Sequence, residues 1–267
     1  MPAGIWHEQA GSGPAVVLLH AGVADSGMWD EQFHAFAGRY RVVRFDARGF
    51  GRSPYAPGRF SPVEDVRDLL DELAIERAAL VGASMGAAVA LDVAIAYLER
   101  VWALVVAAPA VRGHPWGSEV RHFQQEEEAA LEADDVERAV ELNLRMWVDG
   151  PKRPGGEVSP ELRDRVGGMQ RRAFELDREG AALTPEPELV SPLWKTEQRL
   201  PEIRTPTLVL VGDADVDDAL EKAELVRAAV PGAEQVVVGA AAHLPSLEQP
   251  AEFDRIVLEF LDDAAGT

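Results

Sequence analysis

The segment Gly82-Ala83-Ser84-Met85-Gly86 carries the residues best suited to nucleophilic chemistry. It has the pattern G-x-S-x-G and lies between an apolar run, Ala78–Val81, and a helical pattern that begins at Met85. In this context the pattern is typical of a sharp strand-to-helix turn that exposes a serine hydroxyl. Glycine at positions 82 and 86 removes side chains that would collide in so tight a turn. Amides at the start of the following helix point toward negative charge that develops beside the serine. We therefore predict that Ser84 is a nucleophile.

A serine hydroxyl needs a neighbouring base, and His243 is the histidine best placed to supply it. If serine, acid and base follow one another along the chain, the base must come after the apolar run Thr207–Val211. Of the six histidines only His243 does so. It follows the run Gln235–Val238, on a loop at the carboxyl end of an expected strand, where open α/β sheets place their sites. The alternative interpretation of His243 is an ordinary histidine on a surface loop.

The carboxylate that orients the base should come from the segment after Thr207–Val211. Four aspartates compete there, namely Asp213, Asp215, Asp217 and Asp218. Asp217 and Asp218 can instead cap the helix that follows, which is a structural role. The end of the preceding strand, Ala107–Pro109, carries no acid and therefore offers no alternative position. The residues alone limit the acid to one segment without choosing among the four.

Short apolar runs alternate with helical patterns along most of the chain. The runs are Ala15–Leu19, Arg41–Phe45, Ala78–Val81, Val101–Val106, Thr207–Val211 and Gln235–Val238, with Ile5–Glu8 as an additional edge strand. Apolar runs without alternation predict strands buried on both faces, as in a parallel sheet. Helices are expected from Pro62 to about Leu73, behind a capping box at Ser61, and over Met85–Leu98, Asp217–Val230 and Ala251–Leu261. This alternation predicts an α/β sheet with helices on both faces.

Residues 112–199 break the alternation. This stretch contains several helical patterns and no strand-like run, and it is far longer than a sheet crossover needs. We predict a helical cap (lid) at 112–199, inserted in a core formed by residues 1–111 and 200–267. Within the cap, Glu126–Glu128 is interpreted as a solvated helix face.

Composition narrows the classes of partner. The 267 residues include 46 acidic and 26 basic side chains, and the formal net charge is −20 at pH 7. Such a charge repels phosphate backbones and anionic lipids, so we expect neither nucleic acid nor a membrane as partner. Cysteine is absent, no histidine pair has metal-ligand spacing, and no glycine-rich phosphate loop is present. We therefore expect no metal and no cofactor. Because the sequence shows no signal peptide and no long apolar stretch, a cytoplasmic location is expected. We expect a monomer or a homodimer.

Taken together, the motifs resemble those of the α/β-hydrolase superfamily over essentially the whole chain. The matching segments are His20-Ala21-Gly22, Asp46 to Ser53, the turn at Ser84, Gly212-x-x-Asp215, and His243 to Pro250. The resemblance implies an α/β-hydrolase fold and places the acid at Asp215 rather than Asp213. It also implies an oxyanion hole built from the backbone amides of Met85 and Gly22, with Val23 as a less favoured neighbour. His20 and the Asp46–Ser53 segment are interpreted as structural.

Large apolar residues in the cap and near the predicted oxyanion loop are candidates for binding substrate. They are Val23, Trp29, Trp116, Phe123, Met146 and Trp147. As a group they favour a small apolar substrate, although any single one is more often core than ligand wall. The prediction is a serine hydrolase that cleaves carboxylic esters or lactones with apolar groups through an acyl-enzyme intermediate. A carbon–carbon bond hydrolase or a cofactor-free perhydrolase of the same fold is the alternative. A ligand receptor or signalling protein that retains the triad is the alternative of another class.

Overall fold

A seven-stranded sheet forms the centre of the molecule, whose computed structural model describes residues 4–153, 158–191 and 195–266. The strand order is β1-β3-β2-β5-β6-β8-β9. The strands are β1 (His7–Ala10), β2 (Ala15–Leu19), β3 (Arg41–Phe45), β5 (Ala78–Ala83), β6 (Val101–Ala107), β8 (Thr207–Gly212) and β9 (Glu234–Val238). β1 pairs antiparallel with β3, and every other neighbouring pair in this sheet is parallel. The mostly parallel sheet predicted from the apolar runs is confirmed.

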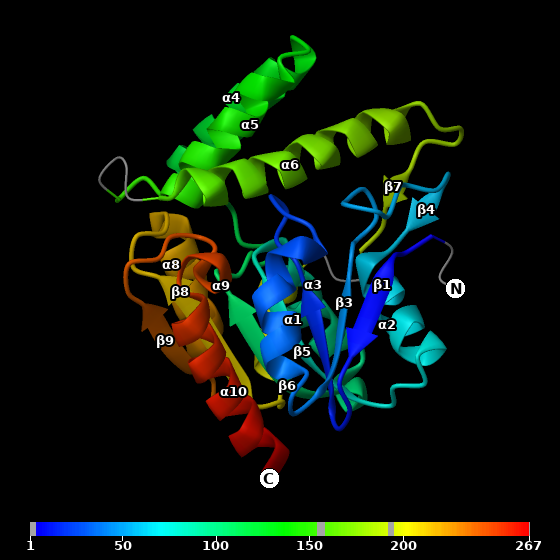
Figure 1. Cartoon of the computed structure of the whole chain (residues 1–267), viewed down its shortest axis with the longest axis vertical. Coiled ribbons are helices and arrows are strands. Elements are labelled where there is room, and N and C mark those ends of the chain that lie inside the picture. The colour runs from blue at the N-terminus through cyan, green and yellow to red at the C-terminus, as the bar shows by residue number, and fades with distance from the viewer. Residues whose placement is uncertain (1–3, 154–157, 192–194, 267) are drawn as a thin grey trace.

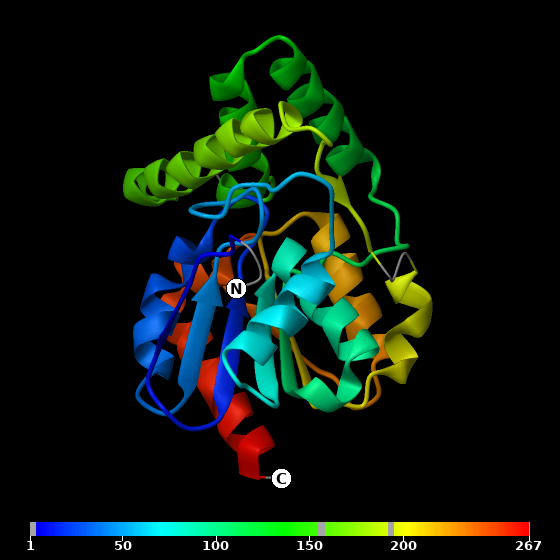
Figure 2. The ribbon, with the colours of Figure 1, turned by 90° about the vertical axis from the view of Figure 1, so that its right-hand side faces the viewer.

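Helices cover both faces of this sheet, as the two views in Figure 1 and Figure 2 show. On one face lie α1 (Asp30–Phe36) and α10 (Pro250–Gly266), which contact each other. The other face carries α2 (Pro62–Glu72), α3 (Met85–Ala96) and α8 (Asp217–Ala229). Short helical segments complete the connections: η1 (Ser26–Trp29), η2 (Leu98–Arg100), α7 (Thr196–Arg199), η4 (Leu200–Glu202) and α9 (Pro245–Glu248).

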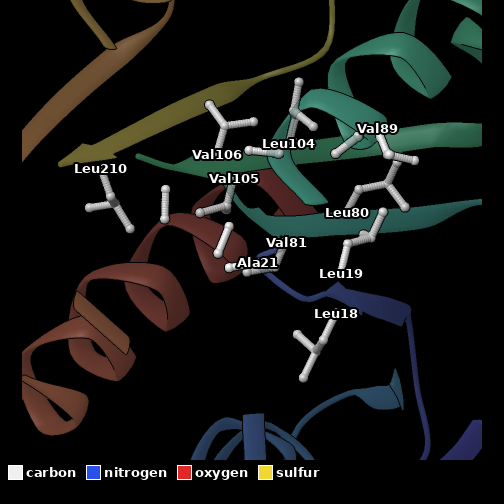
Figure 3. Close-up of a cluster of buried hydrophobic side chains, with 14 of the residues drawn as sticks. Leu18, Leu19, Ala21, Leu80, Val81, Val89, Leu104, Val105, Val106 and Leu210 are labelled. Carbon is white, nitrogen blue, oxygen red and sulfur yellow. The ribbon is translucent and has the colours of Figure 1, made fainter. Parts of the chain in front are cut away.

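The central strands are buried along their whole length. All residues of β2, β5 and β8 are buried, because helices cover the sheet on both sides. Figure 3 shows side chains of β2, β5, β6 and β8 packed together with Val89 of α3. This packing fixes the position and direction of β5, and therefore the position of the turn that follows it.

Two expectations about strands are wrong in detail. The edge strand is His7–Ala10 rather than Ile5–Glu8, although Ile5 is buried. Its limits follow from the pairing with β3, which runs from His7 opposite Phe45 to Ala10 opposite Val42. In addition, the stretch 112–199 contains a strand, β7 (Glu188–Leu189), which pairs in parallel with β4 (Arg59–Phe60). Two residues are too short to leave a recognisable apolar pattern.

A separate group of helices lies over the carboxyl-terminal edge of the sheet (Figure 1). It comprises α4 (Ser118–Glu132), α5 (Val136–Asn143), the π-helical turn η3 (Leu144–Asp149) and α6 (Pro160–Ala181). α4 packs against α5, and α5 packs against α6. Among the described residues, no helix combines the length and the apolar character needed to cross a membrane. The space between these helices and the sheet edge holds the candidate site.

Candidate active site

Ser84 occupies a strained turn between β5 and α3. Its φ of 50° and ψ of −107° lie in a region that residues with side chains seldom adopt. Its N–H donates a hydrogen bond of 2.8 Å to the carbonyl of Ala107 on the neighbouring strand. A Cβ atom on Gly82 would lie 2.5 Å from the carbonyl oxygen of Gly86, and one on Gly86 would lie 2.3 Å from that of Leu19. The turn can therefore form only with glycine at both positions.

The structure brings Ser84, His243 and Asp215 into one hydrogen-bonded chain. Ser84 Oγ lies 2.8 Å from His243 Nε2, and His243 Nδ1 lies 2.9 Å from Asp215 Oδ2. His243 and Asp215 are almost completely buried, whereas Ser84 is only half-buried. With Nδ1 donating to the carboxylate, Nε2 is free to accept the serine proton. The three residues follow β5, β8 and β9, whose carboxyl ends meet at the same edge of the sheet.

Of the four aspartates after β8, only Asp215 contacts His243 among the described residues. Its Oδ1 also accepts a hydrogen bond of 2.8 Å from the N–H of Val216, which fixes the carboxylate. Asp213 is exposed, two residues earlier in the same turn. Asp217 and Asp218 lie in the first turn of α8 without capping it, since its cap residue is Val216.

The backbone amides of Met85 and Gly22, which were predicted to form an oxyanion hole, belong to two segments that line the cleft with Ser84. Met85 is the first residue of α3, so its N–H has no acceptor within the helix. Gly22 lies in the loop after β2, close to Met85. A Cβ atom added to Gly22 would lie 3.6 Å from the Cβ of Met85. Val23, the next residue, lines a cleft that also contains Ser84 and His243. This geometry suits the predicted oxyanion hole, which stays a prediction.

His20 braces the loop that carries Gly22. Its Nε2 accepts a hydrogen bond of 3.0 Å from the N–H of Ala47, and its Nδ1 lies 2.9 Å from the carbonyl oxygen of Ala21. Burial lowers the pKa of His20, which favours the neutral ring that these two bonds require. Asp46 holds the next loop by accepting bonds from the N–H groups of Ser26 and Arg52, each 2.9 Å long.

Glu248 clamps the loop that carries His243, a role that the sequence analysis missed. Its carboxylate accepts hydrogen bonds from the N–H groups of Ala242 (2.9 Å) and Leu244 (3.0 Å), the two neighbours of His243. It also forms an ion pair with Arg153, and the side chains of Glu248 and Arg153 are only 4% and 7% exposed. Arg153 lies between η3 and α6, so this ion pair connects the helices over the sheet edge to the loop that carries His243. An acid five residues after the histidine was the only available signal.

An open cleft of about 590 Å³ contains Ser84 and His243 and has an aromatic wall. The Trp147 ring lies 4.4 Å from the His243 ring, centroid to centroid. Phe123 and Trp116 contact Trp147 edge-on, at 5.6 Å and 6.2 Å. Four of the predicted substrate-binding residues therefore line this cleft: Val23, Trp116, Phe123 and Trp147.

Trp29 and Met146 do not line the cleft, and the expectation that they do is wrong. Trp29 is fully buried and packs against Phe253 of α10, inside the core. Met146 lies beside a different hollow, between α4 and α5. Successive residues of a helical turn point in different directions, so Trp147 faces the cleft and Met146 cannot.

The cleft also has polar walls that the sequence analysis did not expect. Glu127, Asn143 and Gln170 line it, and Asn143 Nδ2 donates a hydrogen bond to Glu127. The interpretation of Glu126–Glu128 as a wholly solvated face is therefore wrong for Glu127. Burial raises the pKa of Glu127, and the bond from Asn143 offsets this only in part.

A second cavity of about 210 Å³ lies on the far side of Met85. Most of its lining is apolar and includes Leu19, Phe45, Phe50, Tyr55, Phe60, Val89 and Leu189. Met85 and Arg112 line both this cavity and the cleft.

A model of the alpha/beta hydrolase family matches residues 16–256, and the chain belongs to that family. It is 28% identical over 255 residues to 3-oxoadipate enol-lactonase 1 of Acinetobacter baylyi, covering 93% of this chain and 88% of the relative. It is 29% identical over 273 residues to 2-hydroxy-6-oxo-6-phenylhexa-2,4-dienoate hydrolase of Comamonas testosteroni, covering 96% and 91%. The solved structure of carboxylesterase CesB (YbfK) from Bacillus subtilis has a TM-score of 0.72 at 27% identity, covering 97% and 88%. These likenesses confirm the expected fold and show that the protein is a hydrolase of this family.

We predict that Gly86→Ala lowers the free energy of unfolding by about 1–3 kcal/mol, because the new methyl group collides with backbone atoms that cannot move aside. Hydrolytic activity should fall with it, since the turn at Ser84 must shift. Gly168→Ala is the matched control, because nothing lies within 4 Å of its added Cβ. In the interior of α6 it should raise stability by about 0.5–1 kcal/mol. Thermal denaturation measures both, and equal effects would contradict this account of the turn.

We predict that Glu248→Gln lowers kcat by about 10- to 100-fold with little change in KM. The variant loses the charge that holds the amides on either side of His243, and small displacements of a catalytic group are costly. Glu252→Gln is the control. It breaks an exposed ion pair with Arg255 within α10 and should be nearly neutral. Steady-state kinetics with an activated ester distinguishes them. Wild-type kcat in Glu248→Gln would refute the clamp.

Proposed function

We propose that the protein is a serine hydrolase that cleaves carboxylic esters or lactones with apolar groups through an acyl-enzyme on Ser84. The observation that carries the proposal is the hydrogen-bonded chain from Ser84 through His243 to Asp215. Its open end lies in a cleft with an aromatic wall. The names of an enol-lactonase and a carboxylesterase among the similar proteins support an ester or lactone bond as the target.

In the first half-reaction, Ser84 Oγ attacks the carbonyl carbon while its proton passes to His243 Nε2. The carbonyl oxygen gains negative charge, which the N–H groups of Met85 and Gly22 stabilise. In measured cases one such donor contributes about 2.7–4 kcal/mol to lowering the barrier. His243 then gives its proton to the leaving alkoxide oxygen, and the carbon–oxygen bond breaks. Asp215 keeps the imidazole oriented and stabilises its charged form.

In the second half-reaction, water takes the place of the leaving alcohol. His243 Nε2 removes a proton from this water, whose oxygen attacks the acyl carbon, and the same two amides stabilise the oxyanion. Collapse of the intermediate returns the proton to Ser84 Oγ and releases the carboxylic acid. These steps use only groups of the protein and require no cofactor.

Residues 112–199 act in this proposal as a cap over the site. Trp147 and Phe123 belong to this stretch, and they shield His243 from bulk water on one side. A less polar environment strengthens the interactions of the developing charges with the two amides. The apolar groups of the substrate would lie along this wall and in the cavity beyond Met85.

We predict that the wild-type protein hydrolyses p-nitrophenyl esters of acids with two to twelve carbons and that Ser84→Ala lowers the rate by about 10⁶-fold. Ser12→Ala, at an exposed position, is the control and should leave the rate unchanged. The chain length with the highest kcat/KM measures the space available to the acyl group. Full activity of Ser84→Ala would eliminate the acyl-enzyme, and an inert wild type would eliminate simple esterase activity.

Cleavage of a carbon–carbon bond is the second candidate, because one of the similar proteins is named a dienoate hydrolase. It predicts turnover of vinylogous 1,5-diketones and poor turnover of saturated alkyl esters. The opposite pattern would remove it. A shift in melting temperature with such ligands, without product, would instead favour a receptor.

A further inference from the structure

Besides the exposed Gln124, three polar side chains of the helices over the sheet edge line the cleft and have no part in the mechanism above. They are Glu127 of α4, Asn143 at the end of α5 and Gln170 of α6, and together they are called the polar roof. All three line the same cleft as Ser84 and His243. A substrate held at Ser84 is therefore within the same space as these groups.

Gln170 has a buried hydrogen-bond acceptor that is not used. The residue is 5% exposed, and its Oε1 accepts no hydrogen bond from any described residue. A buried oxygen without a donor is unfavourable, because it has lost water and gained nothing in return. The last torsion of a glutamine side chain is soft, and its rotation exchanges the positions of Oε1 and Nε2, so the oxygen can be presented to a donor in the cleft. A donor on a ligand would satisfy it.

Glu127 and Asn143 also offer acceptors. Asn143 Nδ2 donates both to Glu127 Oε1 and to the carbonyl oxygen of Ala139, the latter at 2.9 Å. An amide nitrogen has two hydrogens, and both are used here. The polar atoms that this pair still offers to a ligand are therefore oxygens, which accept hydrogen bonds.

The charge of the cleft points in the same direction. Arg112 and His114 line the cleft, but Arg112 pairs with Asp92 at 2.9 Å and His114 with Glu197 at 3.0 Å. The hydrogen-bond partner of Glu127, in contrast, is a neutral amide. Among the described residues that line the cleft, Glu127 is the one acid, and its negative charge would repel a substrate carboxylate.

We infer that the polar roof binds a hydrogen-bond donor of the substrate, a hydroxyl or an amide N–H, and rejects substrates that carry a carboxylate. This inference rests on the proposed function and narrows it. The substrate is an uncharged ester or lactone with such a donor, whose apolar remainder contacts the aromatic wall. Gln170 and Glu127 are thus specificity-determining residues rather than catalytic ones.

The test compares three p-nitrophenyl esters of similar length whose acyl chains end in a methyl, a hydroxyl or a carboxylate group: heptanoate, ω-hydroxyhexanoate and monoadipate. Shorter and longer homologues allow for the distance between Ser84 and the roof. The measured quantity is the ratio of kcat/KM values within one enzyme, so that a loss of folded protein cancels. Gln170→Leu should lower the ratio of hydroxyl to methyl ester roughly three- to tenfold, the effect of one hydrogen bond. Glu127→Gln should raise the ratio of carboxylate to methyl ester roughly tenfold.

Gln125→Leu, an exposed change on α4, is the control and should leave both ratios at wild-type values. If Gln170→Leu and Gln170→Met keep the wild-type ratios while the esters are cleaved, the inference is overturned and the proposed function stands. If the wild type cleaves no ester, the proposed function fails. Melting-temperature shifts of Ser84→Ala with ω-hydroxyhexanoate and heptanoate esters then test the roof alone. Equal shifts would overturn the inference, and a larger shift with the hydroxyl ester, lost in the double variant with Gln170→Leu, would support it.

Discussion

The left-handed backbone of Ser84 is the constraint on which the rest of the site depends. A residue with a side chain adopts this conformation only when its surroundings impose it. Here the surroundings are a central strand buried on both faces, a helix that begins at the next residue, and two glycines. A Cβ atom added at either glycine would collide with backbone. The same turn lifts the serine oxygen toward His243 and leaves the amide of Met85 without a partner in its helix. One local strain thus positions both the proposed nucleophile and the first proposed stabiliser of the oxyanion.

The groups around the triad are held by bonds that leave few of their buried polar atoms unpaired. A buried ion pair is expensive unless further hydrogen bonds satisfy both partners, and Glu248 meets this condition through two backbone amides as well as Arg153. His20, on the opposite side of the site, makes a bond with each ring nitrogen. Gln170 is the exception in the part of the cleft that the structure describes, because no described residue donates to its buried oxygen. The contrast separates a network that fixes geometry from a group that we infer to bind a ligand.

Sequence patterns predicted what repeats or is spaced locally. The apolar runs indicated a parallel sheet, and the G-x-S-x-G motif indicated the turn at Ser84, because both depend on neighbours along the chain. The resemblance to a family was needed to choose Asp215, since local sequence does not distinguish four aspartates that lie so close together along the chain. Trp29 and Met146 were misplaced because helical periodicity does not say which wall a side chain faces. Glu248 and Gln170 were missed because their meaning comes from partners far away in sequence, namely Arg153 and the cleft itself.

The central claim is that Ser84 is the activated nucleophile, and covalent labelling tests it most directly. An organophosphonate aryl ester should add one phosphonyl group per chain, and mass spectrometry of the digested protein should place it on the peptide with Ser84. Labelling should disappear in Ser84→Ala and slow strongly in His243→Ala, because the hydroxyl loses its base. Label on another residue, or equal labelling rates in wild type and His243→Ala, would contradict the account.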